Sequence, residues 1–193
     1  MPARTSAVRI RGSDLSAMGL VRSSIPWKCP GFDLSDLSGR RVSLDRYAGS
    51  LVLINFWSIR FEACRREWVS LQGLFEQMEG RDFAILVVNT GDPVSEVQEW
   101  CRDRTPRFPI LLDPHRTTAE ACGVSAVPST FLLDRDGRVL AKATGAREWS
   151  SGAAAEMFRR LLGERVNRHP PGREPAGNIR RGDGSGWRER RRP

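Results

Sequence analysis

The sequence predicts an α/β fold with a central mixed β-sheet. Two apolar runs, residues 51–56 (LVLINF) and 83–89 (FAILVVN), are typical of strands buried on both faces of a sheet. The segment between them repeats apolar residues at helical spacing, so the two strands are expected to be parallel neighbours joined by a right-handed crossover. The Asp136-Gly137 pair between two further apolar runs predicts an antiparallel hairpin that closes the sheet.

An antiparallel hairpin is also expected ahead of the central strand. Residues 32–44 (FDLSDLSGRRVSL) alternate apolar and polar side chains around Ser38-Gly39, which is a hairpin signal. Residues 45–49 (DRYAG) then predict a single turn that ends in glycine. Residues 1–31 show no sustained period and contain proline breakers near their end, so they are predicted to be a flexible basic leader.

The remaining elements are shorter, and most are marked at one end by proline or glycine. They are a helix from Pro93 through Cys101, a strand at 108–113 (FPILLD), a brief helix at 117–122 ended by Gly123, and a last helix at 149–162. The predicted domain therefore spans residues 32–165. Residues 166–193 are rich in arginine, glycine and proline, and they are expected to be a disordered tail.

The composition describes a globular chain whose basic charge lies at its ends. The 193 residues include 39% hydrophobic and 28% charged residues, with a formal net charge of +8. Most of the excess lies in the leader and the tail, and the middle is nearly neutral. No stretch has the roughly 18 apolar residues that a membrane span needs, and no signal peptide is visible, so the compartment is not predicted. The arginine-rich tail could touch nucleic acid or an anionic surface, but its composition favours a solvated tail.

The chain is organised around residues 51–67 (LVLINFWSIRFEACRRE), in which a strand, a short turn and a helix follow one another. Cys64 falls in the first turn of that helix. Unpaired amide groups and the helix dipole favour a thiolate at such a place, so the pattern indicates a redox site. The four cysteines and two histidines do not form the short clusters of a metal site, and no metal or other cofactor is predicted.

This stretch resembles the TlpA/ResA branch of the thioredoxin superfamily, whose strand ends in a pattern such as NFWATWCPPCRxE. The matching residues are Asn55, Phe56, Trp57, Cys64, Arg65 and Glu67. The lead-in hairpin resembles the family pattern DFxLxDLxGKxVSLxDLxGK, and V-P-S-T resembles its cis-proline loop, which gives Pro128 that role. The resemblance implies a thioredoxin-like three-layer α/β/α fold and thiol-disulfide exchange with a protein or small-molecule thiol or disulfide as partner. It also suggests work outside the cytoplasm.

The sequence departs from the family at the most important position. Phe61 stands where the family has the first, attacking cysteine of C-x-x-C, and Arg60 stands where it usually has tryptophan. The motif is thus degenerate, with F-E-A-C in place of a dithiol. The resemblance places Cys64 in the shielded second position, where we expect a raised pKa.

Three functions follow from this half-motif. In the first, Cys64, supported by Glu67, forms a mixed disulfide or sulfenic acid that another thiol resolves. The loop that carries Cys122 faces the site in the family, which makes Cys122 the best internal resolving thiol, and Cys29 on the leader is another candidate. A plain buried helix cysteine is the ordinary alternative for Cys64, and Cys101 is most simply a core residue.

The second function is a redox-inactive binding module, whose groove would be formed by Trp57, Phe61, Val127 and Pro128. The backbone of Val127 would there pair with an extended substrate segment. The third is a one-cysteine peroxidase of peroxiredoxin type. It is the weakest, because that family has a threonine and a proline ahead of its cysteine and this chain does not.

Overall fold

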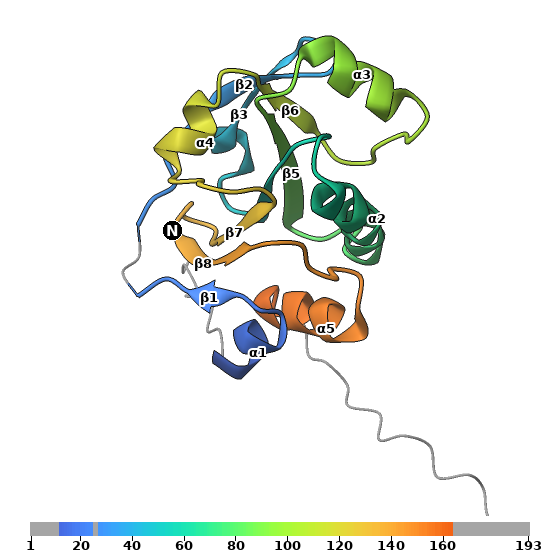
Figure 1. The fold of residues 1–193 in the computed structure, drawn as a ribbon. Helices are drawn as coiled ribbons and strands as arrows, with labels where there is room; N and C mark the ends of the chain where they lie inside the picture. Colours follow the sequence, from blue (N-terminus) through green and yellow to red (C-terminus); the bar gives the residue numbers. More distant parts are fainter. Residues whose placement is uncertain (1–11, 25–26, 164–193) are drawn as a thin grey trace, which may run out of the picture.

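One mixed sheet runs through the computed structural model, which describes residues 12–24 and 27–163 (Figure 1). Among the described residues the sheet has eight strands in the order β1-β8-β7-β4-β5-β6-β2-β3. The strands are β1 (Val21–Arg22), β2 (Asp33–Asp36), β3 (Arg41–Ser43), β4 (Leu51–Trp57), β5 (Phe83–Thr90), β6 (Ile110–Asp113), β7 (Ser129–Leu133) and β8 (Val139–Thr144). The helices are α1 (Gly12–Ala17), α2 (Glu62–Gln77), α3 (Val94–Arg102), α4 (Thr117–Ala121) and α5 (Gly152–Leu161), with a 3₁₀ turn η1 (Leu44–Tyr47).

The pairing of the strands confirms the predicted mixed sheet. β4 runs parallel to β5 and β5 parallel to β6, while β4 pairs antiparallel with β7 and β7 with β8. β2 and β3 form the lead-in hairpin, which joins the sheet through β6. Every side chain of β4 is buried, as its apolar run predicts for a central strand.

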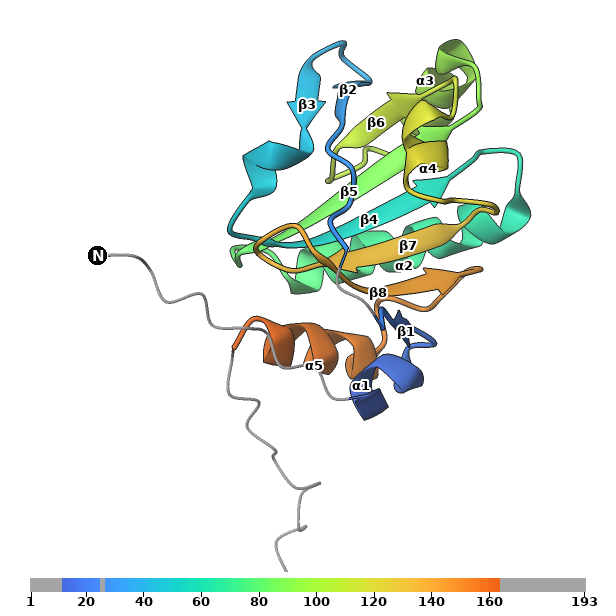
Figure 2. The ribbon, with the colours of Figure 1, turned by 90° about the vertical axis from the view of Figure 1, so that its left-hand side faces the viewer.

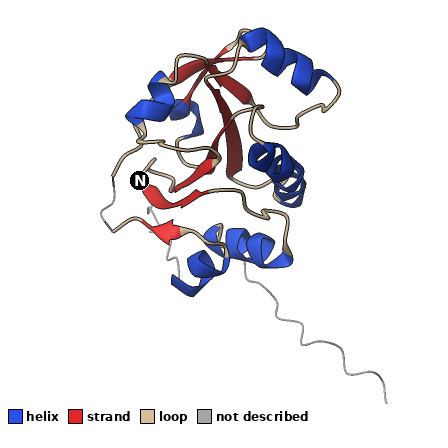
Figure 3. Cartoon of the chain, viewed as in Figure 1, coloured by secondary structure: helices blue, strands red, loops and turns tan. Residues whose placement is uncertain are grey.

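Helices cover both faces of this sheet (Figures 2 and 3). Successive side chains of a strand point to opposite faces, so β4 contributes to two cores. Leu51 and Leu53 pack in one core with residues of α2, α3 and α5, whereas Val52 and Ile54 pack in the other with Ala119 of α4. The sheet therefore separates the layer that contains α2 from the layer that contains α4.

The predicted flexible leader is wrong for the part of it that the structure describes. Residues 12–17 form α1, and Leu15, Met18 and Leu20 are buried in the core that contains α5. Val21 in β1 pairs with Lys142 of β8. Six helical residues and two strand residues are too few to show a period, and their stability comes from tertiary packing. Residues 1–11 and the predicted tail 166–193 lie outside the described residues.

Two boundaries also differ from the prediction. β4 continues through Trp57, one residue beyond the predicted strand at 51–56. α5 begins at Gly152 rather than near Trp149, because the Ser151 hydroxyl accepts a hydrogen bond from the Ala154 amide at 3.2 Å and caps the helix there. The Asp136-Gly137 hairpin and the cis Val127-Pro128 bond are present as expected. Among the described helices, none is long and apolar enough to span a bilayer.

Candidate active site

Phe61 and Cys64 occupy the first turn of α2, directly after the central strand. Phe61 is the N-cap residue in an extended conformation, and its side chain is 53% exposed. Its carbonyl accepts a hydrogen bond from the Cys64 amide at 3.1 Å. Cys64 is only 3% exposed. An aromatic ring therefore stands at the exposed helix tip, and the thiol lies one turn deeper, as the family resemblance implies.

The surroundings of Cys64 disfavour its thiolate. The pKa of Cys64 is raised to about 11, first by burial and then by the negative charges of Glu67 and Asp92, while a hydrogen bond from the Ser58 backbone opposes the rise. Arg65 opposes these charges. At pH 7 the Cys64 thiol is therefore almost entirely protonated, because its pKa lies well above that pH. The helix N-terminus does not overcome the burial of this thiol.

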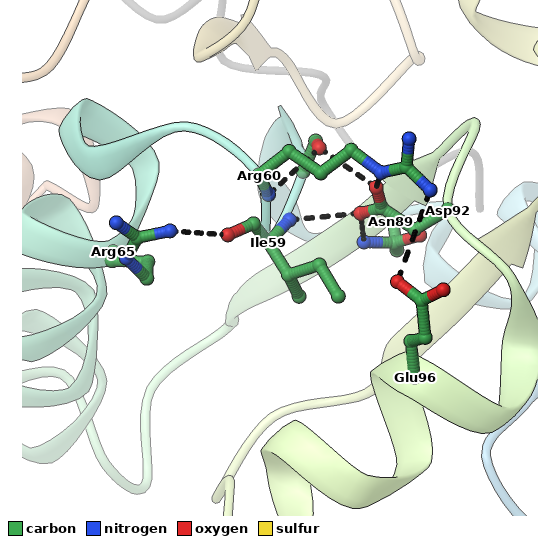
Figure 4. Close-up of polar contacts among 7 residues, drawn as sticks. Ile59, Arg60, Arg65, Asn89, Asp92 and Glu96 are labelled. Atoms are coloured by element: carbon green, nitrogen blue, oxygen red, sulfur yellow. Dashed lines mark hydrogen bonds and ion pairs between the residues drawn. The ribbon is translucent and has the colours of Figure 1, made fainter.

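The loop between β4 and α2 is held by a buried carboxylate, Asp92, which follows β5 (Figure 4). Asp92 accepts hydrogen bonds from the Ser58 hydroxyl at 2.9 Å, the Ile59 amide at 2.8 Å and the Asn89 side-chain amide at 2.7 Å. Arg60 forms an ion pair with it at 3.2 Å between Nε and Oδ1. Arg60 thus binds this carboxylate at the place where the family usually has tryptophan.

Two further contacts complete this loop. The Arg65 side chain donates from Nη1 to the Ile59 carbonyl at 2.6 Å, and Arg60 lies 3.8 Å from Glu96 of α3. Sequence reasoning missed Asp92. Its signal was an acidic residue at the carboxyl end of a buried parallel strand, the edge where functional groups gather in parallel sheets.

Glu67 is a buried carboxylate that joins three parts of the chain. Its Oε1 accepts from the Trp149 indole at 2.6 Å and from the Arg147 amide at 3.0 Å, and its Oε2 accepts from the Asn55 side chain at 3.0 Å. Burial raises the pKa of Glu67, and these hydrogen bonds oppose the rise. The contacts tie α2 to β4 and to the segment before α5. The supporting catalytic role expected for Glu67 stays a prediction.

Trp57 does not line a groove, which corrects its predicted role in substrate binding. It is 1% exposed, and its ring centroid lies 5.1 Å from that of Trp68 and 4.9 Å from that of Trp100. Because β4 continues through this residue, the strand alternation directs the indole into the core beneath α2.

The cis-proline loop presents Val127 and not the proline ring. Val127 is half-buried, Pro128 is buried, and the Pro128 carbonyl accepts from the Gly145 amide at 2.8 Å. Of the four residues predicted to bind substrate, Phe61 and Val127 are therefore the accessible ones. Their role in binding stays a prediction.

The structure brings Cys29 and Cys122 together, and places both apart from Cys64. Their sulfurs lie 3.4 Å from each other, and both side chains pack in the core that contains α4. Cys64 and Cys101 pack in the core on the other face of the sheet. Resolution of a Cys64 disulfide by Cys122 or Cys29 stays a prediction, and it requires one of the segments to move around the sheet. Within residues 12–24 and 27–163, no three histidine, cysteine or acidic side chains gather as metal ligands would.

These features define the class of protein to which the chain belongs. A mixed sheet, a cysteine in the first turn of the helix after its central strand, and a cis-proline loop are the parts of a thioredoxin-like fold. The chain belongs to the AhpC/TSA family, whose model matches residues 25–142.

Curated relatives agree with this assignment. The chain is 36% identical over 116 residues to thiol-disulfide oxidoreductase ResA of Geobacillus thermodenitrificans, a match that covers 60% of this chain and 67% of the relative. It is 31% identical over 116 residues to ResA of Bacillus subtilis, covering 60% of this chain and 65% of that protein. The matched region thus spans about two thirds of the length of these relatives.

Solved structures show the same fold. A candidate DsbE thiol:disulfide interchange protein from Chlorobium tepidum superposes with a TM-score of 0.66 at 25% identity, covering 74% of this chain and 99% of that one. A secreted thiol-disulfide isomerase from Corynebacterium glutamicum superposes with a TM-score of 0.65 at 23% identity, covering 76% and 93%. The predicted thioredoxin-like fold and the resemblance to ResA are confirmed.

Proposed function

We propose that this chain is a ResA-like thiol-disulfide exchange protein that works with a single thiol at its site. The observation that carries the proposal is the exposure of two residues at the start of α2, where Phe61 is 53% exposed and Cys64 is 3% exposed. The similarity to ResA supports thiol-disulfide exchange as the chemistry. The exposed phenylalanine excludes a local two-cysteine cycle.

The single-thiol reaction has two exchange steps. The Cys64 thiolate attacks one sulfur of a substrate disulfide, forms a mixed disulfide and releases one substrate thiol. The thiolate of an external thiol then attacks the substrate sulfur, and Cys64 leaves as a thiolate that regains a proton. Because the pKa of Cys64 is about 11, the first step is slow at neutral pH.

The raised pKa of Cys64 also favours a second candidate, a redox-inactive binding module. In that case Phe61 and the Val127 backbone would contact an extended partner segment, and Cys64 would only pack in the core. The two candidates differ in whether the wild-type protein turns over a disulfide.

The test measures glutathione-dependent reduction of 2-hydroxyethyl disulfide by the wild type, Cys64→Ser and Phe61→Cys. We expect slow turnover in the wild type, its loss in Cys64→Ser, and an increase of at least about 10-fold in Phe61→Cys, because that variant restores an exposed attacking cysteine at the helix tip. Cys101→Ser is the matched control, since Cys101 is also buried in a helix and burial also raises its pKa to about 11.

Two outcomes would contradict the single-thiol proposal. Turnover found only in Phe61→Cys supports the binding module. Consumption of hydrogen peroxide that requires Cys64, without disulfide reduction, supports the one-cysteine peroxidase. A loss of activity in Cys101→Ser equal to that in Cys64→Ser would show that the assay reports folding and not the site.

A further inference from the structure

A pair of cysteines, Cys29 and Cys122, lies outside the site described above. Cys29 and Cys122 are separated by 93 positions in the sequence, yet their sulfurs are 3.4 Å apart in the core that contains α4. Both side chains are buried, with 5% and 4% exposure. A disulfide joins its sulfurs at about 2.05 Å, so the two sulfurs need to approach by only about 1.3 Å.

The segment that carries Cys29 is fixed along the β7–β8 hairpin. The Cys29 amide donates to the Gly137 carbonyl at 3.4 Å, and the Val139 amide donates to the Trp27 carbonyl at 2.9 Å. Trp27 also packs edge-on against Phe131 of β7, with ring centroids 6.0 Å apart. These contacts hold the Cys29 side chain in its place beside α4.

Cys122 is fixed in turn by the end of α4. It is the C-cap residue of that helix, and its amide donates to the Thr118 carbonyl at 3.0 Å. The start of the same helix is capped by Asp113, which accepts from the Thr118 and Ala119 amides at 3.3 and 2.9 Å. Backbone hydrogen bonds thus hold both segments that carry the two thiols.

Cys29 also lies beside a pocket. This pocket has a volume of about 480 Å³ and lies between the segment that carries Cys29, the 3₁₀ turn η1 and the β7–β8 hairpin. The contact between the two thiols lowers the pKa of Cys122 and raises the pKa of Cys29, so Cys122 is the thiol of the pair that loses its proton first.

We propose that Cys29 and Cys122 are a reversible dithiol–disulfide pair that a low-molecular-weight disulfide oxidises. One thiolate of the pair attacks the small disulfide, breaks its S–S bond and releases one small thiolate. The other cysteine, as a thiolate, attacks the protein sulfur of the mixed disulfide and displaces the second small thiolate. Two protein thiols become one disulfide, one small disulfide becomes two thiols, and the two protons pass to the released thiolates.

The disulfide would join the segment ahead of the lead-in hairpin to the end of α4. Cys122 stands six residues before Pro128, so the link fixes the helix that leads into the cis-proline loop. It also closes a loop of 93 residues, which removes conformations from the unfolded chain. Neither step involves Cys64, so the proposal does not depend on the function proposed for that residue.

The test oxidises the full chain with glutathione disulfide and counts free thiols by mass after denaturation and alkylation. A parallel sample is unfolded and refolded in the same redox buffer, so that burial cannot block oxidation. We expect two of the four cysteines to escape alkylation, and a digest to contain one peptide pair linked through Cys29 and Cys122. Oxidation should also raise the melting temperature by about 5–10 °C, because the closed loop is long.

Four variants make the assignment specific. Cys29→Ser and Cys122→Ser should each lose the linked peptide and the shift in melting temperature, whereas Cys64→Ser and Cys101→Ser should keep both. Four alkylated cysteines in both wild-type samples would overturn the proposal. So would a peptide that links Cys64 to Cys29 or Cys122, which would instead support internal resolution at the Cys64 site.

Discussion

At the scale of single residues, a redox site of this kind needs a thiol that is both exposed and easily deprotonated. Here the exposed residue is Phe61, whereas the Cys64 sulfur is buried and has a pKa of about 11. A thiol with a raised pKa is neutral below that pKa, and its reactive thiolate increases as the pH rises. The helix dipole at the start of α2 therefore acts on a sulfur that its surroundings keep protonated.

We expect alkylation of Cys64 by iodoacetamide to rise about tenfold per pH unit from pH 7 to pH 10, without a plateau. At pH 7 the folded protein should react at least about 100-fold more slowly at Cys64 than the chain unfolded in denaturant, where the pKa returns to about 8.5. Peptide mass spectrometry after timed quenching measures both rates. A plateau below pH 9 would show a thiolate that the surroundings of Cys64 stabilise.

The sequence pattern predicted that Cys64 lies in the first turn of a helix, because a helix start is a local feature; the exposed place of Phe61 and the shielded place of Cys64 were implied by the family resemblance. Strand end, turn and first helical turn lie within a few residues, and their spacing determines which side chain caps the helix. The meeting of Cys29 and Cys122 could not be predicted in this way, since it depends on two segments that approach only after the sheet has formed. The strand was predicted to end one residue before Trp57 because periodicity does not define the last residue of a strand.

At the scale of elements, the conformation of the loop at residues 58–60 is determined by Asp92, which follows the neighbouring strand β5. The buried carboxylate accepts from Ser58, Ile59 and Asn89 and pairs with Arg60. All four partners are hydrogen-bond donors, so both side-chain oxygens of Asp92 have to act as acceptors. β5 thereby sets the conformation of the loop that delivers Phe61 to the helix tip.

We expect Asp92→Asn to lower the free energy of unfolding by about 2–4 kcal/mol, because the new amide group faces donors and Arg60 loses its charge partner. Urea denaturation followed by tryptophan fluorescence measures the change. Asp33→Asn is the control, since Asp33 and Arg41 form an exposed ion pair at 3.2 Å, and its loss should cost less than about 0.5 kcal/mol. Equal effects of the two substitutions would show that Asp92 does not hold the loop.

The hairpins and the β-α-β unit were predictable at this scale because each carries its own pattern. Alternation around Ser38-Gly39, the Asp136-Gly137 turn and the helical spacing after residue 61 all act within one element. α1 and β1 carry no such pattern. The three core side chains of this segment, Leu15, Met18 and Leu20, lie within six residues, and only the rest of the molecule shows what they pack against.

At the scale of the whole molecule, the N-terminal segment is part of the domain and reaches toward the site. Asp14 of α1 pairs with Arg160 of α5 at 2.9 Å, and the Gly19 carbonyl accepts from the Arg147 side chain at 3.3 Å. The amide of the same Arg147 donates to Glu67. Residues 12–22 thus extend the sheet and the core on the side of α5, and connect through one arginine to the carboxylate in α2.

We therefore expect Leu15→Ala to lower the free energy of unfolding by about 2–4 kcal/mol, the usual cost of emptying a well-packed leucine site. Leu15 is 1% exposed, whereas Val21, a few residues further along the same segment, is 65% exposed. Val21→Ala is the matched control and should change stability by no more than about 0.5 kcal/mol. Urea denaturation measures both variants. If Leu15→Ala also changes the free energy of unfolding by no more than about 0.5 kcal/mol, residues 12–22 do not belong to the cooperative core. The contact between Arg147 and Gly19 then cannot link this segment to Glu67.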